Sequence, residues 1–174
     1  MLTTALSRVT RDGDASVYRA VPAGDVDGDG VVDVAAVGPE VVRMFTELGQ
    51  FTLRTQDDAW ATIVAEPGSV FADVVNLGDP TDDGRTDLAL TQTWSAPDAT
   101  AWVGLVPSDT LSWRTGLRAS EMPLVALSTR AAGEVGWRAA LVQRADGPTL
   151  ALGAPSADAG ATGAGAVLFL GLPN

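Results

Sequence analysis

Three amino acids are missing from this sequence, which contains no cysteine, no histidine and no lysine. Without cysteine there is no disulfide framework, thiolate metal site or cysteine nucleophile. Without histidine, zincin motifs, Ser-His-Asp triads and most transition-metal sites are excluded. No apolar run approaches the roughly 20 residues that a membrane-spanning helix needs, so we expect no membrane insertion.

Positive charge is also scarce. The 174 residues include 22 acids and 11 bases, which gives a formal net charge of −11. Such a chain is a poor candidate for binding nucleic acid, because phosphate backbones are bound by basic surfaces. Hydrophobic residues make up 46% of the chain, enough to bury a core, so we expect one domain or part of a larger one. Cations are the more natural ligands of such an acidic chain.

An internal repeat organises the chain. Residues 24–37 read GDVDGDGVVDVAAV and residues 78–91 read GDPTDDGRTDLALT, and the offset from Asp25 to Asp79 is 54 residues. A third segment, residues 136–171, keeps the apolar runs but loses most of the acids, so we expect no metal there. A period of 54 residues or slightly more is typical of repeats that each form one four-stranded sheet, such as kelch-type propeller blades.

The apolar segments between these loops are short, rich in β-branched and aromatic residues, and bounded by Gly, Pro and Asp, as strands are. The strongest helical stretch, residues 119–132, is interrupted by Pro123. We therefore expect three to four strands in each repeat. The predicted strands are Val32–Val37, Val41–Phe45, Phe51–Arg54, Phe71–Val75, Asp87–Thr91, Ala101–Val106, Leu111–Trp113, Arg138–Val142, Thr149–Leu152 and Ala166–Leu170.

The first acidic loop predicts a calcium site. Oxygens at positions 1, 3 and 5 of a tight loop converge on one point, a backbone carbonyl at position 7 and a carboxylate at position 9 complete the shell, and glycine at position 6 permits the turn. Four carboxylates this close repel one another, and Ca²⁺ removes that cost. The predicted ligands are the side chains of Asp25, Asp27, Asp29 and Asp33 and the carbonyl of Val31.

The second loop has the same spacing with three carboxylates and one hydroxyl, so weaker binding is expected. Its predicted ligands are the side chains of Asp79, Thr81, Asp83 and Asp87 and the carbonyl of Arg85. EF-hands and dockerins begin in the same way, but both need an acid at position 12. That position is Ala36 in the first loop and Leu90 in the second, and the flanking segments are predicted strands.

The loop and its flanks resemble the FG-GAP or VCBS repeat of integrin-α-like β-propellers, over roughly residues 18–171. The segment AGDVDGDGVVDVAAVGPE carries nearly the whole signature, and the third repeat supplies ALGAP and GAGAVLFL. Trp137 stands where the family usually has the Phe of its FG motif. The resemblance implies one propeller blade per repeat and Ca²⁺ that rigidifies one face. It also implies ligand binding on the opposite face or in side loops.

We therefore expect an all-β chain, with residues 1–174 forming a single propeller segment of about three consecutive four-stranded blades at 15–66, 67–130 and 131–174. Residues 1–14 could supply a strand of a preceding blade. Because propellers close with about four to eight blades, we expect further blades in a longer chain or a homo-oligomer that completes the ring.

The expected function is a calcium-binding scaffold for extracellular recognition or adhesion, with a protein or glycan ligand and no catalysis. The first residues lack the apolar region of a signal peptide, so the extracellular or cell-surface location is inferred from the family and from calcium. The alternative is a lectin-like domain or an accessory domain of a secreted polysaccharide-active enzyme. It draws on five tryptophans, of which Trp94 is expected to be exposed and the others are expected to pack between blades: Trp60, Trp102, Trp113 and Trp137.

Overall fold

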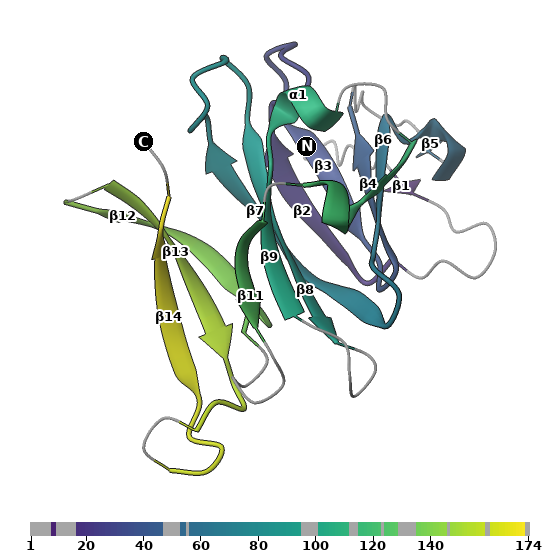
Figure 1. The fold of residues 1–174 in the computed structure, drawn as a ribbon. Helices are drawn as coiled ribbons and strands as arrows, with labels where there is room; N and C mark the ends of the chain where they lie inside the picture. Colours follow the sequence, from purple (N-terminus) through teal and green to yellow (C-terminus); the bar gives the residue numbers. More distant parts are fainter. Residues whose placement is uncertain are drawn as a thin grey trace, which may run out of the picture.

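Short antiparallel strands make up most of the chain (Figure 1). The computed structural model describes residues 8–9, 17–46, 53–54, 56–94, 101–111, 115–122, 124–128, 135–145, 147–158 and 161–172. They form an all-β protein with three small sheets, none of which closes on itself, and a two-stranded ribbon. The expectation of an all-β chain is confirmed.

The first sheet is an up-and-down meander with one added strand. Its order is β10-β6-β4-β3-β2, in which β2 to β6 are antiparallel neighbours and β10 joins the edge of β6 in parallel. The bounds are β2 Arg19–Gly24, β3 Asp33–Val37, β4 Val41–Phe45, β6 Ala61–Val64 and β10 Thr115–Arg118.

The second and third sheets repeat the meander. The second has the order β11-β9-β8-β7 and the third β12-β13-β14, all antiparallel. The bounds are β7 Ser69–Gly78, β8 Asp87–Trp94, β9 Ala101–Val106, β11 Leu124–Ser128, β12 Ala139–Arg144, β13 Gly147–Ala154 and β14 Ala166–Gly171. The ribbon pairs β1 (Arg8–Val9) with β5 (Leu53–Arg54), and the short helices are η1 Gln56–Asp58, α1 Ser108–Leu111 and η2 Ala119–Glu121.

The second sheet lies between the other two and is buried on both faces. Alternate residues point to opposite faces of a strand, and the two hydrophobic clusters follow this alternation. Val74 and Leu88 belong to the cluster shared with the first sheet, whereas Val75 and Ala89 belong to the cluster shared with the third. The core is therefore two layers of apolar side chains separated by one sheet.

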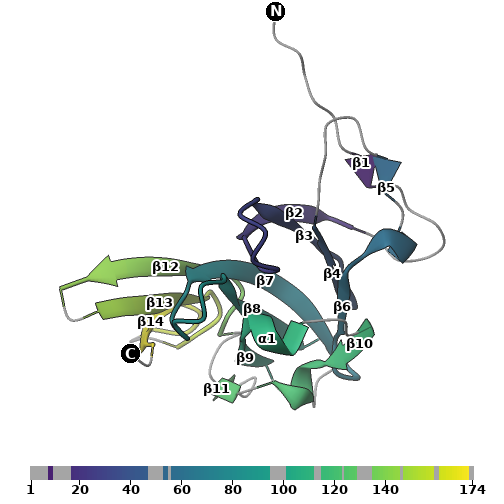
Figure 2. The same cartoon turned by 90° about the horizontal axis from the view of Figure 1, so that it is seen from above.

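The first strands of the three sheets lie side by side. Strand β7 contacts β2 on one side and β12 on the other, although neither pair is hydrogen-bonded as a ladder (Figure 2). Equivalent positions meet there, because Arg19 pairs with Val37 in one ladder and Asp73 pairs with Thr91 in the next. Both partners are 54 residues apart, which is the offset of the sequence repeat.

Two predicted strands differ from the structure. The last strand of the first meander is Ala61–Val64, and the described part of Phe51–Arg54 lies in the separate ribbon. Leu111 ends helix α1, so the predicted strand Leu111–Trp113 is wrong there, and Trp113 lies outside the described residues. The second meander instead ends with Leu124–Ser128, inside the stretch with the strongest helical pattern. Pairing with β9 decides the conformation of this segment.

Candidate metal centre

The first acidic loop, residues 25–32, closes between two paired strand ends. Gly24 of β2 is paired with Asp33 of β3, and a register shift precedes that pair. Gly24, Gly28 and Gly30 have φ of 81°, 84° and 85°. This left-handed region costs an ordinary residue about 1–2 kcal/mol. Glycine at these positions lets the chain coil tightly enough to bring its carboxylates together.

Backbone amides hold the carboxylates of this loop in place. Asp25 accepts hydrogen bonds from the amide nitrogens of Gly28 (2.7 Å) and Gly30 (2.8 Å), one on each carboxylate oxygen. Asp29 accepts one from the amide of Val31 at 2.7 Å. Oxygens of Asp25, Asp27 and Asp29 lie within 4.8 Å of one another. Three of the predicted ligands therefore converge, and their repulsion favours a cation between them.

Asp33 adds a buried carboxylate to this group. Its side chain is fully buried, Oδ2 accepts a hydrogen bond from the amide of Val26 at 2.8 Å, and Oδ1 has no hydrogen-bond partner. Burial raises the pKa of Asp33 to about 6, the negative charges of the three neighbouring aspartates add to the rise, and the Val26 bond opposes it. An unsatisfied buried carboxylate oxygen is costly. A hard cation held by all four acids satisfies it, so the residues present fit Ca²⁺.

The second loop, residues 79–86, is folded by the same pattern of bonds. Asp79 accepts hydrogen bonds from the amides of Asp83 (3.0 Å) and Gly84 (2.8 Å). Asp83 accepts one from the amide of Arg85 at 2.9 Å. The positions equivalent to Asp25 and Asp29 therefore have equivalent roles in shaping both loops.

The acids of the second loop differ in what satisfies them. Both oxygens of Asp87 are used: Oδ2 accepts from the hydroxyl of Thr81 at 2.8 Å, and Oδ1 accepts from the amide of Ser108 at 2.8 Å. The hydroxyl of Ser108 donates to Asp83 at 2.9 Å. The pKa of Asp83 is lowered, chiefly by the bond from the Arg85 amide and then by that from Ser108. Protein donors here take the place that a cation would have.

Ser108 could not be found from the loop motif. It lies 21 residues beyond Asp87 in the chain, at the start of α1, and no spacing rule connects the two. Within the described ranges, only Asp25, Asp27 and Asp29 form a group of three or more potential metal ligands as close as 4.8 Å. The two loops are therefore alike in backbone shape and unlike in the arrangement of their oxygens.

The two loops are joined to each other. The amide of Thr86 donates to the carbonyl of Asp25 at 2.7 Å. A side chain at Gly24 would overlap Thr86, and one at Gly28 would lie 3.4 Å from the side chain of Arg85. The junction between the first and second sheets therefore depends on how the first loop is folded.

The third repeat has a tight turn in place of the loop. Arg144 is paired with Gly147, so only residues 145 and 146 separate the strands. An ungapped alignment of the repeats would put Ala140, Val142 and Arg144 at the ligand positions, but all three lie within β12. Asp146, the acid that remains from the motif, lies outside the described residues.

Three tryptophan side chains are described. Trp102 is buried and Trp60 packs against the cluster between the first and second sheets, as expected of core residues. Trp137 is 47% exposed, contrary to the expectation that it packs between sheets. The side chains of Trp94 and Trp113 lie outside the described residues.

No protein-family model matches the chain, and a search of the curated proteins finds no relative of it. Among the residues that the structure describes, no helix has the length and apolar character needed to cross a membrane.

Proposed function

We propose that the chain is a Ca²⁺-binding β-propeller module that serves as an extracellular scaffold for recognition or adhesion. The observation that supports it best is the unpartnered, fully buried Oδ1 of Asp33 beside three converging carboxylates. Asp25, Asp27, Asp29 and Asp33, with the carbonyl of Val31, would hold the ion. Bound Ca²⁺ supplies positive charge and structural cross-linking, and the chain itself is proposed to catalyse no reaction.

The second loop is proposed as a weaker site. Asp79, Thr81, Asp83, Asp87 and the carbonyl of Arg85 have the spacing of a ligand set. Both oxygens of Asp87 are already used by protein donors, and a cation would have to displace at least one of them. This competition lowers the expected affinity.

The proposed role of the ion is to stiffen the junction between two sheets. The carbonyl of Asp25 accepts the amide of Thr86, so ordering the first loop also orders its contact with the second. A ligand that binds only the folded state adds stability in proportion to its occupancy. Extracellular modules bind Ca²⁺ at about 10⁻⁴ to 10⁻³ M, which is why we place this one outside the cell or on its surface.

Three successive meanders with adjacent first strands support blades of a propeller. Because about four blades is the smallest usual ring, we propose that further blades or a second copy of the chain complete it. The partner is a protein or a glycan. A second candidate function, a carbohydrate-binding or accessory domain of a secreted polysaccharide-active enzyme, is favoured by the exposed Trp137 beside a cavity.

The test is calorimetric titration of chelator-treated protein with Ca²⁺, followed by thermal melting with and without the ion. We expect one stronger and one weaker site, and a rise in melting temperature. Asp29→Ala should abolish the stronger site, whereas Asp158→Ala, which removes an exposed carboxylate of the third sheet, should leave both sites intact. Absence of binding at millimolar Ca²⁺ would show that the acidic loops are turns only.

A further inference from the structure

A cavity of about 290 Å³ lies at the end of the sheets away from the acidic loops. Its lining includes Phe71 and Ala72 near the start of β7, whereas the second acidic loop follows the end of that strand. Residues from all three meanders contribute: Tyr18 precedes β2, Thr93 lies in β8, and Trp137 and Arg138 precede β12. Ligand pockets of small molecules begin at about this size.

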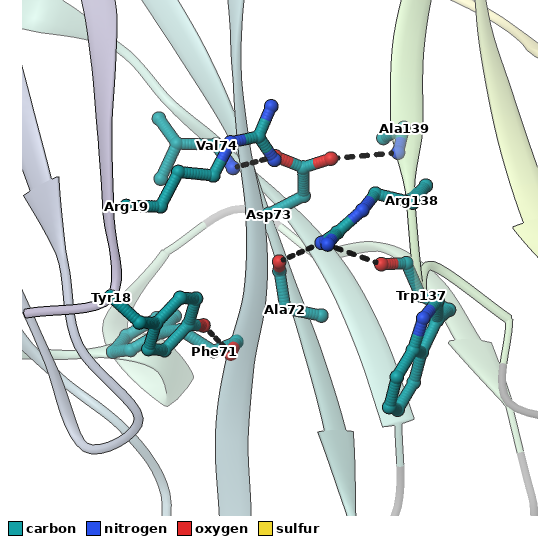
Figure 3. A network of polar contacts seen from close by, with 9 residues as sticks. All are labelled: Tyr18, Arg19, Phe71, Ala72, Asp73, Val74, Trp137, Arg138 and Ala139. Atoms are coloured by element: carbon teal, nitrogen blue, oxygen red, sulfur yellow. Dashed lines mark hydrogen bonds and ion pairs between the residues drawn. The ribbon is translucent and has the colours of Figure 1, made fainter.

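Two half-exposed aromatic side chains stand at this cavity. Tyr18 is 51% exposed and Trp137 is 47% exposed. Figure 3 shows them on either side of β7, both directed away from Asp73. The hydroxyl of Tyr18 donates a hydrogen bond to the carbonyl of Phe71, which anchors its ring. Exposed aromatic rings of this kind offer a flat apolar face together with a polar tip.

Trp137 and Arg138 also line a second hollow, of about 550 Å³. Small residues form the rest of its wall, among them Gly153, Ala154 and Gly165. Because the two hollows share Trp137 and Arg138, they adjoin each other around one aromatic side chain. A ligand built from successive ring-sized units fits this arrangement better than a single compact molecule does.

The guanidinium of Arg138 gives the site a positive charge within a chain whose net charge is −11. Its Nη1 donates to the carbonyls of Ala72 (3.0 Å) and Trp137 (3.4 Å), which fixes the group at the cavity (Figure 3). The neighbouring acid, Asp73, is paired with Arg19 and with the amide of Ala139. Within the described part of the chain, Arg138 forms no ion pair. Its remaining N–H groups are suited to a carboxylate, the partner that a guanidinium binds best.

We propose that this surface binds an acidic oligosaccharide, a chain of pyranose rings that carry carboxylates. One ring would stack on Trp137, with Tyr18 flanking it, and its carboxylate would accept hydrogen bonds from Arg138. The next ring would occupy the second hollow. The apolar face of a pyranose matches an aromatic ring, while its hydroxyls stay hydrated. This inference deepens the proposed recognition role and rests on it, but needs no bound Ca²⁺.

The test uses three acidic oligosaccharides, namely oligogalacturonate, oligomannuronate and a hyaluronan oligosaccharide, titrated calorimetrically into the protein in EDTA. We expect at least one to bind, and methyl esterification of its carboxylates to weaken binding roughly tenfold or more, because charged hydrogen bonds are lost. Trp137→Ala and Arg138→Gln should each produce a similar loss. Arg138→Lys, which keeps the charge but not the planar fork, should bind more weakly than the parent.

Matched controls are Phe169→Ala, which removes an exposed aromatic ring of the same sheet, and Arg144→Gln, which removes an exposed arginine beside it. Both should bind like the parent, and circular dichroism would establish that every variant is folded. Failure of all three oligosaccharides to bind, equal binding of the methyl esters, or binding that survives Trp137→Ala would overturn the inference. Ca²⁺ binding without oligosaccharide binding would overturn it alone, and the reverse would overturn the calcium proposal alone.

Discussion

Removing the carboxylate of Asp73 should separate the three sheets more than any exposed substitution does. Asp73 lies in β7, is only 2% exposed and forms an ion pair with Arg19 of β2. It also accepts hydrogen bonds from the amides of Val74 (2.9 Å) and Ala139 (3.2 Å), the latter at the start of β12. One buried side chain thus bonds to the first strand of every sheet (Figure 3).

The expected cost of Asp73→Ala follows from these bonds. A hydrogen bond to a charged group contributes about 1.5–3 kcal/mol, and the amide of Ala139 would lose its acceptor. The Arg19 side chain is 38% exposed, so water can replace part of its pairing and the ion pair counts for less. The free energy of unfolding should therefore fall by about 2–4 kcal/mol. For a chain of this size, that corresponds to roughly 4–16 °C in Tm.

Urea unfolding and thermal melting of Asp73→Ala, Arg19→Ala and the double variant measure this. Arg19→Ala should cost less, about 1 kcal/mol, and a double-mutant cycle should give a coupling of about 0.5–3 kcal/mol. The control is Glu40→Ala, an exposed acid in the turn between β3 and β4, which should change stability by less than about 0.5 kcal/mol. If Asp73→Ala is no more destabilising than this control, the reasoning that Asp73 joins the sheets is refuted.

Three further outcomes are expected. Gly24→Ala should cost about 2–4 kcal/mol in urea unfolding, because its added carbon overlaps Thr86, whereas Gly116→Ala, with a similar φ of 79° and open space around it, should cost only about 1–2 kcal/mol; equal losses would contradict the close contact. Burial raises the pKa of Tyr18, the sole tyrosine, so its absorbance titration should have a midpoint above 10.0, and the stability that the neutral phenol contributes should be lost as pH rises through that midpoint; a midpoint at or below 10.0 would count against the burial argument. Phe169→Thr should reduce self-association in sedimentation velocity without lowering stability, since this ring is 57% exposed, and unchanged sedimentation would argue against an adhesive face there.

Local sequence patterns predict much of this fold. The strands Val41–Phe45 and Ala101–Val106 have the predicted bounds, because both are short apolar runs between clear turn residues. Strands β6 and β11 were not predicted, and for β11 the reason is clear. Its sequence LVALS has good helix formers, and only its ladder with β9 makes it a strand. Strand propensity depends on such neighbours.

The candidate site divides in the same way. The acidic loops are predictable because all their ligands lie within nine residues and the motif itself folds the loop. Ser108, Asp73 and Thr86 are not, because their partners lie 21 residues or more away along the chain. The cavity at Trp137 is also non-local, since it exists only where three meanders meet.

The parallel strand β10 determines the order in which this chain can fold. Residues 115–118 complete the edge of the first sheet, yet they follow three strands of the second sheet in the chain. The first sheet therefore cannot finish before most of the second has been synthesised, and the closing contact spans about 50 residues, a slow kind of pairing. The first two sheets should behave as one cooperative unit in hydrogen exchange, with amides of β6 and β10 opening together with β8. The third sheet, which joins only one face of this unit, should exchange at a lower free energy and refold after it.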